Sequence, residues 1–319
     1  GVGFQPGFVW QKGRNVTYNH LLFDSVRGAT KYLRSNAANA ETTEANSLES
    51  FDTDGFTVGN NSSGSDMSNS SVNYVAWNWK AGGTGVTNDD GSIQSTLSAN
   101  TEAGFSIVTY TGTNSSTETI GHGLGTAPDM IIVKSRDNSS NFWCVYHSAN
   151  TSEPETELLR LNTTDATLDG VAYWNDTAPT SSVFTVGTSS ALNNTDNFVA
   201  YCFAEKDGYS RFGSFTGNAS ADGPFVYTGF RPAFVIIKTS SHAGENWYAL
   251  DNKRDVHNVV GRYLFPNATS AEADYTSSYP LDFLSNGFKI RNASYPNQSG
   301  RTYIYMAFAE QPFKYSNAR

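Results

Sequence analysis

The stretch Phe8-Val9-Trp10-Gln11-Lys12 decides the fold, because the chain repeats its pattern twice. The matching stretches are Met130-Ile131-Ile132-Val133-Lys134 and Phe234-Val235-Ile236-Ile237-Lys238. Each follows a turn that contains a proline, and each ends on a lysine. Short runs rich in Val, Ile and aromatic residues that are bounded by turn residues predict β-strands.

Four further landmarks follow each lysine in the same order. They are an aromatic strand (20–23, 143–146 and 247–250), an apolar run ending in an Asn turn (32–36, 158–162 and 263–267), a short strand (55–58, 183–186 and 287–290) and a closing aromatic strand (74–79, 198–203 and 303–308). The lysine and the last closing aromatic residue are 67, 69 and 70 residues apart in the three copies. Self-similarity at a fixed period predicts a repeat architecture.

We therefore predict an all-β chain of three tandem β-sandwich modules of the jelly-roll or lectin-like kind. The modules would span residues 1–98, 99–208 and 209–319, with residues 81–98 as a Gly-rich linker between the first and the second. Modules two and three join through only four residues, 205–208, so we expect these two to pack more rigidly on each other.

The first copy differs from the others at its beginning. Copies two and three contain an earlier strand, at residues 105–112 and 212–217, whereas the first copy starts at Gly1 without one. We expect that this stretch was trimmed from a longer polypeptide, or that another chain supplies the strand.

Composition excludes several classes of partner. The net charge is −9 and only 16% of the residues are charged, so no basic stripe for nucleic acid is expected. No apolar run is long enough to cross a bilayer, so we expect no membrane insertion.

Conventional active-site patterns are not found in the sequence. The five histidines and two cysteines do not have metal-ligand spacing, and no nucleophile elbow occurs. His122 lies in a Gly-rich turn, and the acidic segments 52–55 and 88–91 have turn chemistry instead of a complete calcium loop. We predict no enzyme activity, no catalytic residue, no metal and no cofactor, and we expect Cys144 and Cys202 to be buried thiols.

Two matched ion pairs follow the aromatic strand. Asp24 and Arg27 in copy one correspond to Asp251 and Arg254 in copy three, whereas copy two has His147 and Asn150. A catalytic pair would not be discarded in one copy, so we interpret these residues as exposed pairs that fix a loop, each contributing less than about 1 kcal/mol.

Aromatic residues outside the landmarks are the candidates for partner contacts. Exposed Tyr and Trp rings make good recognition surfaces and stack on sugar faces. The candidates, which lie between the landmarks, are Tyr173, Trp174, Tyr275, Tyr279 and Tyr295.

Three stretches resemble a repeat family in the virion proteins of marine tailed phages. They are Leu21-Leu22-Phe23-Asp24-Ser25-Val26-Arg27-Gly28-Ala29-Thr30-Lys31-Tyr32-Leu33, the segment around Asp52-Thr53-Asp54-Gly55-Phe56, and the ending with Glu310-Gln311-Pro312-Phe313-Lys314-Tyr315. The resemblance implies a virion surface component such as a tail fibre or another appendage, and it carries over no functional residue. It also implies an extracellular location and, by analogy with fibres, a homo-oligomer such as a trimer.

The leading hypothesis is a structural protein of the virion that attaches non-covalently to a host-surface glycan or protein and to neighbouring virion proteins. An array of carbohydrate-binding modules, perhaps attached to a polysaccharide-degrading tailspike, is the alternative. A hydrolytic tailspike is a third hypothesis, which requires a pair of carboxylates in a groove.

Overall fold

The computed structural model describes residues 1–59 and 67–311, and it confirms the all-β prediction. Strands β1 to β7 are Phe8–Gly13, Leu21–Asp24, Lys31–Arg34, Thr42–Thr43, Leu48–Asp52, Gly55–Val58 and Tyr74–Trp79. Strands β8 to β17 are Val86–Asn88, Ser95–Asn100, Phe105–Thr111, Glu118–Gly121, Met130–Ser135, Cys144–His147, Glu157–Arg160, Leu168–Asp169, Val183–Val186 and Asn197–Phe203. Strands β18 to β26 are Ser210–Thr216, Phe225–Tyr227, Pro232–Thr239, Tyr248–Asp251, Arg262–Tyr263, Ala273–Asp274, Leu281–Leu284, Gly287–Ile290 and Thr302–Ala309. The described helices are single turns: η1 (Pro154–Thr156), α1 (Val171–Trp174) and α2 (Ser190–Asn193).

We refer to β1–β7, β8–β17 and β18–β26 as modules 1, 2 and 3. The main sheets have the orders β4-β3-β2-β1-β7, β15-β14-β13-β12-β17-β10-β9-β8 and β18-β26-β20-β21. The closing strand of each module (β7, β17, β26) lies beside the strand that carries the repeated lysine (β1, β12, β20), and all these pairs are antiparallel. The matched stretches of the sequence therefore occupy matched places in three sheets.

The segment expected as a linker contains structure of its own. Strand β9 pairs with β10, and β8 pairs with β9, so residues 86–100 extend the sheet of module 2. A polar, Gly-rich composition did not prevent pairing, because alternating residues such as Ser95 and Leu97 are buried against the sheet.

The recurring Asn turn and the recurring lysine both satisfy backbone groups. The Asn side chain accepts from the N–H at the start of the aromatic strand, in the pairs Asn36–His20 (2.8 Å), Asn162–Trp143 (2.9 Å) and Asn267–Trp247 (2.9 Å). The buried lysine ammonium donates to the carbonyls of the loop that follows it, for example from Lys134 to Ser135 and Asn138. The asparagine and the lysine recur in each module because a buried polar backbone group must be paired.

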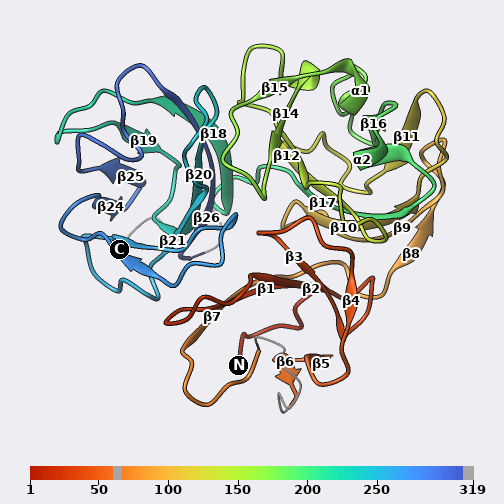
Figure 1. Cartoon of the computed structure of the whole chain (residues 1–319), viewed down its shortest axis with the longest axis horizontal. Coiled ribbons are helices and arrows are strands. Elements are labelled where there is room, and N and C mark those ends of the chain that lie inside the picture. Colours follow the sequence, from red (N-terminus) through yellow and green to blue (C-terminus); the bar gives the residue numbers. More distant parts are fainter. Residues whose placement is uncertain (60–66, 312–319) are drawn as a thin grey trace.

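The three modules are not arranged in a linear row. They pack around one shared hydrophobic core (Figure 1). One cluster of buried hydrophobic residues draws on all three modules, and each module also has a separate cluster of its own. At the centre lie Trp79, Phe203 and Phe308, which are equivalent residues at or next to the ends of the three closing strands. Their ring centroids are 6.2, 5.6 and 6.1 Å apart, so each module contributes one ring to a pseudo-threefold contact.

A backbone hydrogen bond closes each of the three junctions between modules. The N–H donors and carbonyl acceptors occupy equivalent positions: Glu41 to Arg136 (2.7 Å, modules 1 and 2), Thr167 to Ser240 (2.8 Å, modules 2 and 3) and Glu272 to Arg14 (2.6 Å, modules 3 and 1). The third bond joins the last module to the first, which makes the arrangement a closed ring of modules. The expectation that modules 2 and 3 pack more rigidly on each other stays a prediction.

Indole groups add a second set of contacts between modules. The Nε1 of Trp143 donates to the Arg34 carbonyl at 2.9 Å, and that of Trp247 donates to the Arg160 carbonyl at 3.0 Å. At the third junction His20 takes the place of the tryptophan. Its Nδ1 accepts a hydrogen bond from the Trp10 indole. The backbone of Phe265 is close enough to favour the protonated ring, but Nε2 has no hydrogen-bond partner among the described residues.

Candidate functional site

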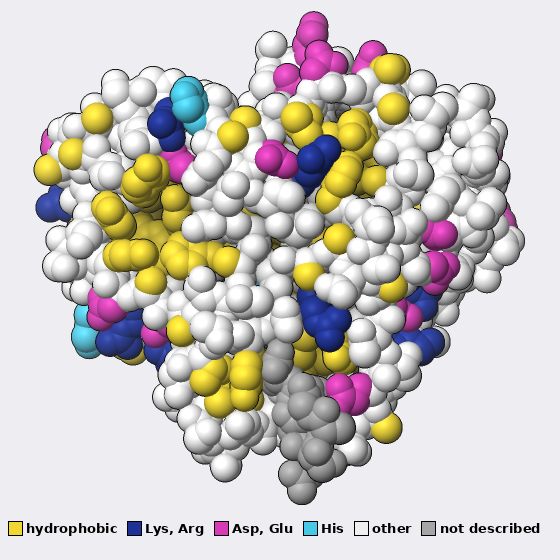
Figure 2. All heavy atoms as spheres, viewed as in Figure 1, with side chains coloured by type: hydrophobic (Ala, Val, Ile, Leu, Met, Phe, Trp, Pro, Cys, Tyr) yellow, Lys and Arg dark blue, Asp and Glu magenta, His cyan; other side chains and the backbone are white. Residues whose placement is uncertain are grey.

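A cavity lined by tyrosine side chains in module 3 is the candidate binding site. It has a volume of about 240 Å³. Its lining residues are Gly244, Glu245, Asn246, Tyr248, Tyr263, Phe265, Tyr275, Tyr279 and Tyr295. Figure 2 shows hydrophobic side chains gathered more densely over the lobe of module 3 than over the rest of the face in view.

The five tyrosines form a continuous series of ring contacts. The successive centroid distances are 5.5 Å for Tyr248–Tyr263, 5.6 Å for Tyr263–Tyr275, 5.0 Å for Tyr275–Tyr279 and 5.9 Å for Tyr279–Tyr295. Edge-to-face and tilted pairs at these distances are favourable beyond the area that they bury. The wall of the cavity is therefore held by its own side chains.

The inner and outer rings are held in different ways. Tyr248 on β21 and Tyr263 on β22 are buried, whereas Tyr275, Tyr279 and Tyr295 lie in loops and are half-buried. The hydroxyl of Tyr263 donates to the Tyr279 carbonyl at 2.7 Å, and the Tyr279 N–H donates to the Tyr275 carbonyl at 2.8 Å. These bonds fix the loop that carries the outer rings.

One carboxylate, Glu245, lines the cavity. It is 3% exposed, accepts from the Thr239 hydroxyl at 2.5 Å and forms an ion pair with Arg301. The neighbouring Asn246 side chain accepts from Asn267 at 2.7 Å. Since the carboxylate is already paired and stands alone among the lining residues, the cavity offers oriented polar atoms but not the two carboxylates that glycoside cleavage needs.

Burial keeps the inner tyrosines protonated. It raises the pKa of Tyr248 and of Tyr263 above the usual range for a phenol, and the nearby Glu245 carboxylate raises that of Tyr248 further. In the part of the chain that the structure describes, the hydroxyls of Tyr275, Tyr279 and Tyr295 have no hydrogen-bond partner in the protein. The cavity thus presents aromatic faces and free hydroxyl donors together.

The structure brings together three of the five aromatic residues expected to contact a partner, namely Tyr275, Tyr279 and Tyr295. The other two lie on α1 in module 2. Trp174 is 2% exposed and packs on Tyr146 with a centroid distance of 6.0 Å, so it belongs to the core and presents no ring face to a partner. Tyr173 is half-buried beside Phe142.

Sequence reasoning missed the inner half of the cavity. Tyr248, Tyr263 and Phe265 lie in the landmark strands, where core packing was the expected use. A comparison of the three copies could have indicated this difference. Phe265 of module 3 occupies the position that Arg34 and Arg160 have in modules 1 and 2, so an arginine is replaced by an aromatic residue there.

The matched ion pairs are buried instead of exposed, which corrects the sequence-based interpretation. The side chains of Asp24 and Arg27 are both 0% exposed, and those of Asp251 and Arg254 are 4% and 2% exposed. Each aspartate also accepts from an aromatic side chain of the neighbouring module. These donors are Tyr201 to Asp24 (2.8 Å) and Trp77 to Asp251 (3.0 Å).

Module 2 replaces the aspartate because its neighbour cannot donate. The position of Trp77 and Tyr201 is occupied in module 3 by Met306, which carries no hydrogen-bond donor. His147 there interacts through Nε2 with the Tyr305 carbonyl at 3.0 Å. The charged and titratable groups at these positions therefore join neighbouring modules.

The cysteines and His122 are also buried. Cys144 and Cys202 are free and buried, as predicted, and burial raises the pKa of Cys202 to about 12, which leaves it unreactive. The Nε2 of His122 contacts the Thr180 carbonyl at 3.1 Å. No group of three or more His, Cys, Asp or Glu side chains suited to a metal ion occurs within residues 1–59 and 67–311.

Comparisons with known proteins give a family but no activity. A family model described as a domain of unknown function, DUF7483, matches residues 1–312. The chain belongs to the DUF7483 family. No curated protein and no solved structure matches it. In the described ranges of this DUF7483 chain, no helix has the length and apolar character to cross a membrane.

Proposed function

We propose that the chain is a surface protein of a phage virion, a tail fibre or another appendage, which attaches non-covalently to a host-surface glycan. Its three modules, which we take to be β-sandwiches of the jelly-roll or lectin-like kind, act as a rigid platform for the binding site. The observation that carries the binding proposal is the tyrosine-lined cavity of module 3.

The chemistry of the cavity suits a sugar ring. Tyrosine rings offer flat apolar faces to the C–H side of a sugar, and their hydroxyls exchange hydrogen bonds with sugar hydroxyls. The volume of about 240 Å³ is below the about 300 Å³ from which drug-sized ligand pockets start, so it suits a single ring. Glu245 and Asn246, whose side chains are held by Thr239 and Asn267, supply fixed hydrogen-bond acceptors at one side of the cavity.

The virion assignment is supported by the resemblance of residues 21–33, 50–59 and 307–319 to phage appendage proteins. Such proteins work outside the cell, and this chain depends on no disulfide, because both cysteines are free. We also propose that the chain assembles as a homo-oligomer, a trimer by analogy with fibres, beside other virion proteins. Localisation in intact particles by electron microscopy with a specific antibody tests this part, and particles without the protein would overturn it.

A glycan array tests the binding part. We expect the protein to bind a host polysaccharide and the Tyr279→Ala variant to bind at least about tenfold more weakly, which corresponds to about 1.4 kcal/mol. Tyr173→Ala is the matched control, since Tyr173 is a half-buried tyrosine of module 2 outside the cavity, and it should bind normally. Absence of binding to every host polysaccharide, or equal loss in both variants, would contradict the proposal.

An array of carbohydrate-binding modules on a polysaccharide-degrading tailspike is the second candidate, and it uses the same cavity. Release of reducing ends from the bound polysaccharide by the particle, but not by this chain alone, would favour it.

A further inference from the structure

In the described part of module 1, two strands that both other modules have are not found. In modules 2 and 3 the closing strands β17 and β26 have partners on both sides, β10 and β12 in one case and β18 and β20 in the other. Similarly, β16 pairs with β11, and β25 pairs with β19 as well as β24. Among the described residues, β7 pairs only with β1 and β6 only with β5.

Among residues 1–59 and 67–311, no strand lies beside the edge of β7 that faces away from β1. The carbonyl of Asn73 accepts from Arg14 beside β1, so alternation along the strand turns Ala76 and Asn78 towards the other edge. The Asn78 amide is folded onto this edge, where Nδ2 donates to the Ala76 carbonyl at 3.1 Å. Its Oδ1 is buried and has no partner in the described part of the chain.

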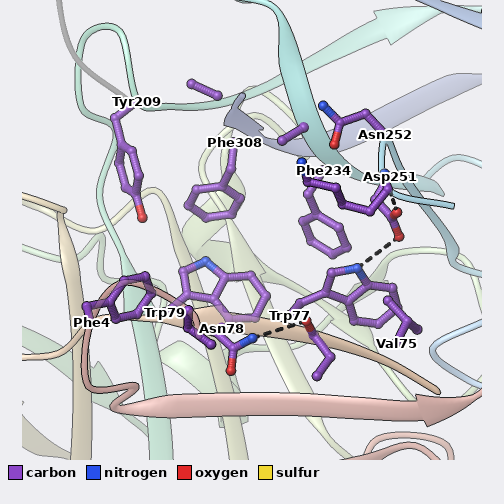
Figure 3. Close-up of a pocket in the computed structure, with 15 residues that line it drawn as sticks. Phe4, Val75, Trp77, Asn78, Trp79, Tyr209, Phe234, Asp251, Asn252 and Phe308 are labelled. Carbon is purple, nitrogen blue, oxygen red and sulfur yellow. Dashed lines mark hydrogen bonds between the residues drawn. The ribbon is translucent and has the colours of Figure 1, made fainter. Parts of the chain in front are cut away.

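A cavity of about 410 Å³ lies at the same place (Figure 3). Its labelled lining includes Trp77 and Trp79 of β7 together with Phe234, Asp251 and Phe308 of module 3. The predominance of aromatic rings makes it a site for apolar side chains. Asp251 and Lys253 also line it, and the Asp251 carboxylate is paired with Arg254.

The other two modules show what fills this position. Phe105 at the start of β10 contacts Phe8 of module 1 at 6.0 Å, and Phe212 of β18 contacts His147 of module 2 at 6.2 Å. The counterparts of Phe8 and His147 in module 3 are Phe234 and Asp251, and both line the cavity. A strand added to β7 would therefore place its inward side chains in the cavity.

At this cavity, an N-terminal aromatic residue is less buried than its counterpart in module 3. Phe4 corresponds to Phe230, which is 1% exposed in the core of module 3. Phe4 is half-buried and lies at the cavity beside Trp79.

We propose that a two-strand segment from outside residues 1–319 completes module 1 by pairing with β7 and β6. Its first strand is uncharged or weakly charged and places an aromatic or aliphatic side chain in the cavity. This side chain would stand opposite Trp77, as Ile107 stands opposite Tyr201 and Phe212 opposite Met306. Main-chain hydrogen bonds supply affinity at such an edge, and the alternate side chains supply specificity.

Two other occupants of the edge are possible outcomes of the test. One is the chain's own segment 312–319, which follows the described residue Gln311 close to the cavity-lining Ala309. The other is a strand from a second copy of the chain.

A graft tests the proposal in the full chain. A copy of residues 209–228 is placed directly before Gly3, the counterpart of Gly229, so that the added segment has the length found in module 3. We expect the midpoint of thermal unfolding to rise by about 5 °C or more. Amide hydrogen exchange in a peptide that covers β7 should slow at least about tenfold.

The matched control carries Phe212→Asp in the grafted copy alone, which should remove both effects. An unchanged melting midpoint and unchanged exchange with the first graft would overturn the proposal. Slow amide exchange of β7 in the ungrafted chain would also overturn the proposal. If deletion of residues 312–319 then restores fast exchange, the edge belongs to that segment. If dilution restores fast exchange, the edge belongs to a second copy of the chain.

Discussion

Beside the backbone hydrogen bond that all three junctions share, modules 2 and 3 meet through neutral side chains, among them Asn150 and Thr167, whereas the other two junctions carry ion pairs at these positions. Around that bond, module 1 meets module 2 through Asp24, Arg27, Glu41 and Arg136, and module 3 meets module 1 through an equivalent set. The comparison teaches that the backbone contact defines the ring and that side chains vary with the donor available opposite them.

The charged junctions are connected networks. Arg27 binds both Asp24 and Glu41, and Arg136 adds a bidentate pair to Glu41 with distances of 3.0 and 2.9 Å. Burial alone would raise the pKa of Glu41, but the two arginines hold it below its usual value. At the neutral junction, Asn150 occupies the position of Arg27 and bonds Thr167 at 2.9 Å.

The largest expected effect comes from removing the buried arginine. Arg27→Met leaves the Asp24 carboxylate buried without its positively charged partner, and we expect a loss of about 3–5 kcal/mol in the free energy of unfolding, measured with urea. The equivalent change at the neutral junction, Asn150→Ala, should cost about 1 kcal/mol. Equal losses in the two variants would show that the junctions do not differ in this way.

The neutral junction should make stability depend on pH. Burial lowers the pKa of His147 to about 4, opposed by the Tyr305 carbonyl and the charge of Asp129. The unfolded chain binds a proton at this histidine below about pH 6.5, and the folded chain does not until about pH 4. Stability present above pH 6.5 is therefore lost as the pH falls to 4, by up to about 3 kcal/mol from this residue.

His147→Gln tests this pH dependence. Between pH 6 and 4.5 the slope of unfolding free energy against pH should fall by about 1.4 kcal/mol per pH unit relative to the parent. His20 and His122, whose pKa values burial also lowers, keep their share of the slope. His242→Gln, at an exposed histidine, is the control, and an identical slope in all three proteins would contradict the assignment.

The smallest expected effect comes from giving the neutral junction a charged pair. Ser240 and Thr167 occupy the positions of Arg136 and Glu41, so Ser240→Arg combined with Thr167→Glu would copy the bidentate pair. Because such pairs are partly exposed, we expect a gain of at most about 1 kcal/mol that declines with added salt. If the Ser240→Arg variant alone gains the same free energy of unfolding as the double variant, the ion pair is not the source of the gain.

The landmark strands of the modules could be predicted from sequence, but the closure of the modules into a ring could not. Each landmark strand is a local pattern of apolar and turn residues, so β1, β12 and β20 lie where the pattern places them. The bond from Trp143 to the Arg34 carbonyl joins residues 109 positions apart, and no local pattern encodes it. Part of the predicted linker forms strands β8 and β9 instead, because the pairing of β9 with β10 outweighs the flexible composition of this segment.

The candidate site was predicted in part for the same reason. Tyr275, Tyr279 and Tyr295 stand out because they lie in loops, and the structure places them in one cavity. Trp174 also lies between landmarks, but α1 turns its ring into the core of module 2. Tyr248 and Tyr263 look like core residues in sequence, and only the arrangement of β21 and β22 shows that they line a cavity.

Calorimetry of the whole chain tests the closed ring most directly. If the modules share one core through Trp79, Phe203 and Phe308, residues 1–319 should unfold in a single transition whose calorimetric and van't Hoff enthalpies agree. Separate transitions for the modules, with a calorimetric enthalpy well above the van't Hoff value, would contradict the account.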